Sequence, residues 1–67
     1  MTFNTIRAFS IQTGDKMPAP LAWGGWDHSK ALRVTDIRDS AGMKVFTLET
    51  GATVRAFPMN KVPFIRH

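Results

Sequence analysis

Cysteine and tyrosine are absent from this chain, and acidic side chains are few. Without cysteine there is no disulfide and no thiolate zinc site, and the two histidines are too few to hold a metal alone. No stretch approaches the roughly 18 apolar residues that cross a membrane as a helix. The first residues also lack the charged and apolar segments of a signal peptide. We therefore expect no cofactor, no metal, no membrane partner and a cytoplasmic location.

Signatures of catalysis are missing as well. The sequence has no nucleophile–base arrangement, no glycine-rich phosphate loop and no carboxylate pair at a useful spacing. Asp27 and His28 are adjacent, but neighbours in an extended chain point to opposite faces. The sequence therefore predicts a protein that is not an enzyme.

The length of the chain sets the number of domains and the source of stability. With 67 residues the chain forms one domain, residues 1–67. A domain of this size buries only about 60% of its unfolded surface and is marginally stable without help. Its stability must come from the apolar core, from a partner or from self-association, so a homodimer is one possibility.

Basic residues outnumber acidic ones. Nine Lys and Arg against five Asp and Glu give a net charge of +4 and a pI near 10.4. This balance suits an anionic partner such as nucleic acid. However, charged residues make up only 21% of the chain and no basic run occurs, so a basic domain without a polyanion ligand remains the alternative.

Three consecutive antiparallel strands are predicted in the middle of the chain, at residues 31–37, 43–48 and 53–57. Alternating apolar and polar positions and a high content of β-branched and aromatic residues favour strands here. Turn residues separate them at 39–42 and 49–52, and Pro58 ends the third strand.

Side-chain parity divides these strands into two faces if the turns keep the register. The predicted core face carries Leu32, Val34, Met43, Val45, Val54 and Ala56. The opposite face carries Arg33, Thr35, Lys44, Phe46, Leu48, Arg55 and Phe57. Asp36 breaks the alternation before Ile37, which indicates a bulge or a bend.

The remaining segments are predicted as a first strand, a long loop and a short last strand. The first strand covers residues 5–12. Alternating prolines and paired glycines predict a loop over residues 13–30. After Phe57, residues 58–62 are typical of a 3-10 turn and residues 63–65 of an edge strand.

This order of elements resembles the SH3-like small barrel. The resemblance covers residues 9–65 and depends on three stretches: Gly14-Asp15-Lys16-Met17, Glu49-Thr50-Gly51 and residues 57–64. It implies an all-β fold, a five-stranded antiparallel barrel with a long first loop and a 3-10 turn before the last strand. Because the chain has no tyrosine, the tyrosine-lined groove that binds proline motifs is not expected. Members of this superfold bind nucleic acid or proteins, so the fold alone does not fix the function.

Nucleic-acid binding, to DNA or RNA, is the main functional hypothesis. Arg33, Lys44 and Arg55 occupy corresponding places on neighbouring strands, with Phe46 and Phe57 between them. Cations hold phosphates and aromatic rings stack on bases, so these five residues form the predicted site. Further cations could extend it: Arg7, Arg38, Lys61 and Arg66. The alternative is that Phe46 and Phe57 pack inside and leave a solvated basic face.

Binding of a host protein is the second hypothesis. Trp23 and Trp26 in the predicted loop would contact the partner, because aromatic anchors dominate interface energies. Small size and the lack of catalytic groups suit an adaptor or inhibitor from a phage or mobile element. The alternative for the two tryptophans is that they close one end of the core.

Overall fold

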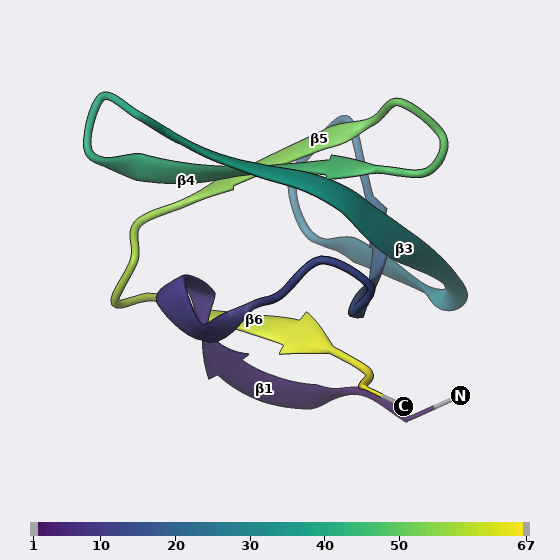
Figure 1. Ribbon diagram of the computed structural model, residues 1–67. Coiled ribbons are helices and arrows are strands. Elements are labelled where there is room, and N and C mark those ends of the chain that lie inside the picture. The colour runs from purple at the N-terminus through teal and green to yellow at the C-terminus, as the bar shows by residue number, and fades with distance from the viewer. Residues whose placement is uncertain (1, 67) are drawn as a thin grey trace.

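The computed structural model describes residues 2–66, and this part of the chain is all-β apart from one short 3-10 helix (Figure 1). The strands are β1 (Asn4–Arg7), β2 (Lys16–Pro20), β3 (Trp26–Ser40), β4 (Met43–Leu48), β5 (Thr53–Ala56) and β6 (Lys61–Phe64). The 3-10 helix η1 (Ala8–Ser10) follows β1. Within residues 2–66 no helix is long and apolar enough to cross a membrane.

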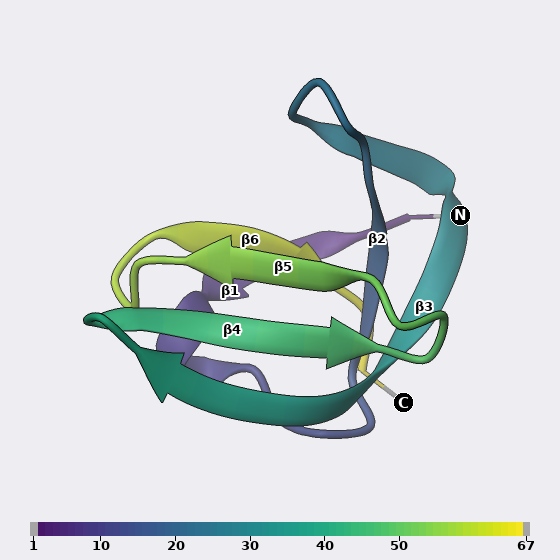
Figure 2. The same ribbon diagram turned by 90° about the horizontal axis from the view of Figure 1, so that it is seen from above.

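All strand pairs are antiparallel and form two sheets that curl into a half-barrel. One sheet has the order β2-β3-β4-β5, and the other consists of β1 and β6. Lys16 and Ile65 join the sheets through two backbone hydrogen bonds of 2.9 and 2.8 Å. The long strand β3 pairs with β2 in its first half and with β4 in its second half, so it bends around the core (Figure 2).

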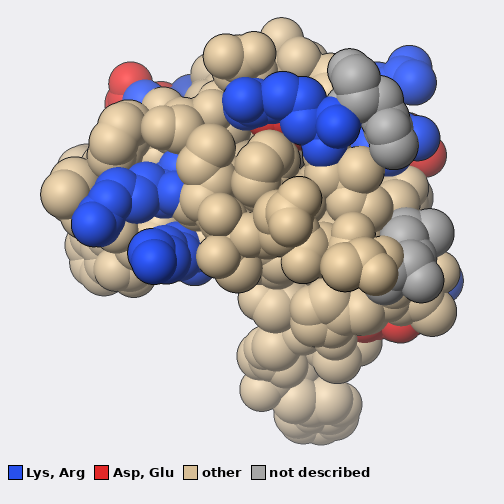
Figure 3. Space-filling view, turned by 90° about the horizontal axis from the view of Figure 1, so that it is seen from below, with Lys and Arg blue, Asp and Glu red and all other residues tan. Residues whose placement is uncertain are grey.

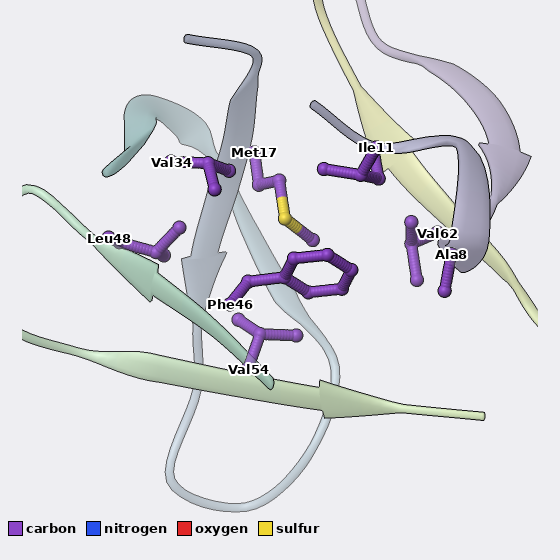
Figure 4. Packing of buried hydrophobic residues seen from close by; sticks show 8 residues of the cluster. All are labelled: Ala8, Ile11, Met17, Val34, Phe46, Leu48, Val54 and Val62. Atoms are coloured by element: carbon purple, nitrogen blue, oxygen red, sulfur yellow. The ribbon is translucent and has the colours of Figure 1, made fainter. Parts of the chain in front are cut away.

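Eight buried apolar residues fill the space between the sheets (Figure 4). They come from both sheets and from the segment between β1 and β2: Ala8, Ile11, Met17, Val34, Phe46, Leu48, Val54 and Val62. Phe46 and Met17 are both 0% exposed and are the largest of them. Together with Pro18, which is also fully buried, they fix the β2–β3 hairpin and the central strands around one core.

The three hairpin-linked strands in the middle of the chain are confirmed. Strand β4 has the predicted bounds, β5 ends one residue early, and β3 is much longer than predicted. Ala41 and Gly42 form the two-residue turn between β3 and β4 with φ of 53° and 76°. Positive φ at both central residues is the type I′ pattern, whose twist matches that of the flanking strands.

The predicted parity of β4 is wrong, and a bulge in β3 is the reason. Val34 pairs with Leu48 and Asp36 with Thr47, so Thr35 is an extra residue in β3. One extra residue reverses the inward and outward positions that follow. Ile37 therefore faces the core, and its partner Phe46 faces it as well.

Residues 13–30 do not form the predicted loop, because they contain β2 and the first part of β3. Strand β2 lies at the edge of its sheet. The backbone nitrogens of Pro18 and Pro20 point to the same side of β2, because alternate residues of a strand do. On the outer side of an edge strand no N–H donor is needed, so both prolines are tolerated there. The alternating prolines that indicated a loop therefore fit an edge strand.

The ends of the chain also differ from the predicted five-strand arrangement. The first strand stops at Arg7, and the 3-10 helix lies directly after it instead of before the last strand. Residues 57–60 form a turn in which the Asn60 N–H donates to the Phe57 carbonyl at 3.0 Å. The last strand, β6, starts at Lys61, two residues earlier than predicted. Because β2 is an additional strand, the described chain has six strands instead of five.

Candidate nucleic-acid interface

The five residues predicted to bind nucleic acid do not share one face. Phe46 lies in the core and cannot stack on a base. Lys44 lies on the same side of β4 as Phe46, and its ammonium is 2.7 Å from the Asp39 carboxylate. Arg55 pairs with Val45 and lies on the outer side with Phe57, which is 57% exposed. Arg33 belongs to the other half of β3, which pairs with β2. The bulge separates the predicted site into these parts.

Three of the basic side chains are neutralised by acids within residues 2–66. Arg38 pairs with Asp36 at 2.8 Å, and Lys44 with Asp39 at 2.7 Å. The third pair joins Arg66 to Asp15 at 2.8 Å and is the one with a buried carboxylate. These contacts remove Arg38, Lys44 and Arg66 from the cations that are available to an anionic ligand.

The Asp15–Arg66 pair closes the C-terminal end of the fold. The Arg66 Nε and Nη2 donate to the two Asp15 carboxylate oxygens at 2.9 and 2.8 Å, and Nη2 also donates to the Ser10 carbonyl at 3.0 Å. The Gln12 N–H donates to the same carboxylate at 2.9 Å. The hydrogen bonds from Arg66 lower the pKa of Asp15 from its ordinary value, although burial opposes this, and the Gln12 bond lowers it further. The Arg66 guanidinium also lies 5.3 Å from the centre of the Phe64 ring.

A first pair of like charges lies across β1 and β6. Arg7 and Lys61 are directly opposite each other in the register, so their side chains leave the same face of this sheet. The neighbouring pair Ile6 and Val62 faces the core, so Arg7 and Lys61 face outward. An Arg7 Nη1 donates to the Met59 carbonyl at 2.9 Å, and neither cation has an acidic partner within residues 2–66.

A second pair of like charges lies across β2 and β3. Lys16 is opposite Arg33 on one side and opposite Ile65 on the other, so the three side chains share one face. The next residue of β2, Met17, is in the core, which leaves Lys16 on the outer side. A Glu49 carboxylate oxygen accepts a hydrogen bond from the Arg33 backbone N–H at 3.1 Å but forms no ion pair with its guanidinium.

We call the side chains of Arg7, Lys61, Lys16 and Arg33 the cationic face. Ile65 lies opposite Lys16 and is four residues along the chain from Lys61. The two cation pairs are therefore separated by about 13 Å. Between them, Thr5 and Pro63 are the intervening outward pair. In Figure 3, which views the molecule from the β1–β6 side, Lys and Arg lie at the left and along the upper part, with uncharged surface between them and acidic atoms only near the edges. Like charges directly opposite each other destabilise a sheet, so the arrangement costs folding energy unless an anion is bound.

The two tryptophans have different environments. Trp26 begins β3, is half-buried and packs against the core. Trp23 lies in the turn between β2 and β3 and is 97% exposed. The alternative that both tryptophans close one end of the core is therefore wrong, because only Trp26 packs against it.

The sequence contained only part of the signal for the cationic face. The sequence shows Arg7 and Lys61 as cations that could extend a positive field, but their pairing joins the two ends of the chain. Lys16 and Arg33 are brought together by a hairpin that was expected to be a loop. Among residues 2–66 no group of three His, Asp or Glu side chains could hold a metal ion.

The fold and site therefore define a small all-β protein with a curled antiparallel sheet and an unneutralised cationic face. Comparison with protein-family models, with curated proteins and with solved structures gave no match to this chain.

Proposed function

We propose that this protein is a non-enzymatic nucleic-acid-binding module that holds phosphates on its cationic face. The single observation that carries the proposal is that two pairs of like charges, Arg7 with Lys61 and Lys16 with Arg33, lie directly opposite each other in the register. A polyanion relieves the repulsion in both pairs and releases its own counterions. The site is thus assigned to the β1–β6–β2 side of the molecule instead of the β3–β5 face expected from parity.

We propose further that the half-barrel is an SH3-like small barrel. The support is the chain order: a first strand, a long excursion, three hairpin-linked strands, a turn and a short last strand that pairs with the first. The β2–β3 hairpin takes the place of the long first loop. An experimental structure in which β1 and β6 were not paired would contradict this assignment.

Neutralising one cation of the face tests the functional proposal. We expect Lys61→Gln to weaken binding of a labelled single-stranded oligonucleotide of about 20 nucleotides several-fold at about 50 mM salt. The slope of log affinity against log salt should fall by about 0.7, because one phosphate contact is lost. Fluorescence anisotropy at several salt concentrations measures both quantities.

Arg38→Gln is the matched control. It removes the same charge, but Arg38 is already paired with Asp36. We expect its affinity to stay within about twofold of the wild type and its salt slope to be unchanged. Equal losses for Lys61→Gln and Arg38→Gln would mean that only net charge matters, and no binding by the wild type at low salt would reject the proposal.

A further inference from the structure

Trp23 lies in the turn between β2 and β3, and the hairpin formed by these strands projects from the body of the protein (Figure 2). Its strands β2 and β3 are anchored by Met17 and Pro18, which are fully buried, and by Trp26, which packs against the core. Two backbone hydrogen bonds close the tip: the Leu21 N–H donates to the Gly25 carbonyl at 3.2 Å, and the Gly24 N–H to the Leu21 carbonyl at 3.1 Å. The indole is therefore held out from the body on a defined support.

Nothing in the described chain covers the Trp23 ring. Its exposure is 97%, whereas a side chain with this much apolar area is normally buried or bound. Its neighbours are Ala22 and Gly24, and a Cβ built at Gly24 or Gly25 would meet no atom within 4 Å. Both faces of the indole are consequently open to a flat ligand.

The size of the tip favours a base over a folded protein. A stable protein interface buries roughly 800 Å² on each partner, and one tryptophan supplies only about 150–250 Å². At the tip the one other large exposed hydrophobic side chain is Leu21, at 47% exposure. Stacking on a nucleic-acid base needs just one aromatic face and is worth about 1–3 kcal/mol.

Charged side chains lie at the end of this hairpin next to the body of the protein, which we call its root, and are absent from its tip. From Met17 to Trp26 no residue carries a charged, hydroxyl or amide side chain, so the tip offers no cationic side chain to a phosphate. The root carries Lys16 and Arg33 of the cationic face. Four residues along β2 place Pro20 about 13 Å from Lys16, so a strand held at the root reaches the tip within a short segment.

We infer that Trp23 stacks on an unpaired base, so that the ligand of the cationic face is a single-stranded nucleic acid. This inference rests on the proposed function. Bases within a duplex are already stacked on their neighbours, whereas those of a single strand offer free faces to an aromatic side chain. The affinity for a single strand should therefore depend on Trp23, and the affinity for a duplex should not.

The test compares Trp23→Ala, Trp23→Phe and Leu21→Ala with the wild type. We expect Trp23→Ala to weaken binding of an oligothymidylate of about 20 nucleotides by roughly 5- to 150-fold without changing its salt slope. Trp23→Phe should keep part of the affinity, because it retains an aromatic face. Leu21→Ala removes exposed apolar surface from the same tip and should change the affinity less than about twofold.

A second readout is the indole fluorescence. Stacking should quench the emission during titration with the oligothymidylate, and this change should be lost in Trp23→Ala while a duplex of the same length leaves the emission nearly unchanged. The outcomes also separate the two proposals. Wild-type affinity in Trp23→Ala together with a weakened Lys61→Gln overturns the stacking role alone and would leave Trp23 to a partner protein. Wild-type protein that binds neither probe overturns both.

Discussion

At the scale of single residues, the charges of this protein are of two kinds. Asp15 is nearly enclosed and receives hydrogen bonds from Arg66 and from the Gln12 backbone, so its charge serves the fold. Lys61 has no acidic partner within residues 2–66 and faces Arg7, so its charge does not serve the fold. Burial and partners thus separate a structural ion pair from cations that can bind a ligand.

The structural role of Asp15 predicts a pH-dependent loss of stability in Asp15→Asn. The pKa of this carboxyl is lower in the folded chain, so its contribution is fully present above the ordinary value of 3.8 and is lost as the pH falls through the folded value. At pH near 7 we expect Asp15→Asn to lower the free energy of unfolding by about 1–3 kcal/mol, since the Arg66 donors lose a charged acceptor. Urea unfolding of the wild type and of Asp15→Asn, at neutral pH and at about pH 2.5, measures the difference in their free energies of unfolding. This difference should be smaller at acid pH.

Asp36→Asn is the control for this prediction. Asp36 also pairs with an arginine, but the two side chains are 46% and 79% exposed, so the change should cost less than about 1 kcal/mol. If Asp15→Asn lowered the free energy of unfolding by the same amount at acid pH as at neutral pH, the assigned role of the Asp15 charge would be contradicted.

At the scale of elements, the β3–β4 turn sets the register and carries a strained residue. Ala41 has φ of 53° and is the one non-glycine residue with positive φ within residues 2–66. A left-handed conformation costs an L-residue roughly 1–2 kcal/mol, and asparagine tolerates it better than alanine. We expect Ala41→Asn to raise the free energy of unfolding by about 0.5–1 kcal/mol, as a shift of the urea midpoint at constant slope.

Gly42→Ala gives the opposite test of the same turn. Gly42 has φ of 76°, and a Cβ there would meet no atom within 4 Å, so any loss of stability would come from backbone conformation alone. We expect a loss of about 1 kcal/mol. Ala41→Asn and Gly42→Ala changing stability in the same direction would exclude this type of turn.

The elements also explain which features could be predicted from the sequence. Alternation and turn residues predicted the bounds of β4 and the three-stranded meander, because those signals are local. The broken alternation at Asp36 indicated the bulge that the structure has there, but the parity argument kept a regular register and so assigned the wrong face of β4 to the core. The pairing of Arg7 with Lys61 joins opposite ends of the chain, and no local pattern encodes it. The five predicted site residues therefore do not share a face, and the cationic face joins residues that no local pattern brings together.

At the scale of the whole molecule, electrostatic repulsion opposes folding. The chain carries a net charge of +4, and two of its cation pairs are placed directly opposite each other. Repulsion between like charges destabilises a compact state and is screened by salt. A protein selected for stability alone would place an acid at one position of each pair. Under the proposed function, binding and stability therefore make opposite demands on the cationic face.

Reversing one charge of the face should consequently stabilise the protein and abolish its binding. We expect Lys61→Glu to raise the melting temperature by a few degrees at low salt, because a repulsive pair with Arg7 becomes an attractive one. The gain should shrink at about 1 M salt, where charges are screened beyond roughly 3 Å. Arg55→Glu is the matched control, since Arg55 is an exposed cation outside the face, has no ion pair within residues 2–66, and gives the same change in net charge. It should not raise the melting temperature.

Thermal melts at low and high salt, followed by oligonucleotide titration, measure stability and binding in one series of variants. A gain in Arg55→Glu equal to that in Lys61→Glu would attribute the effect to net charge. A stabilised Lys61→Glu that still bound the oligonucleotide would separate the cationic face from nucleic-acid binding.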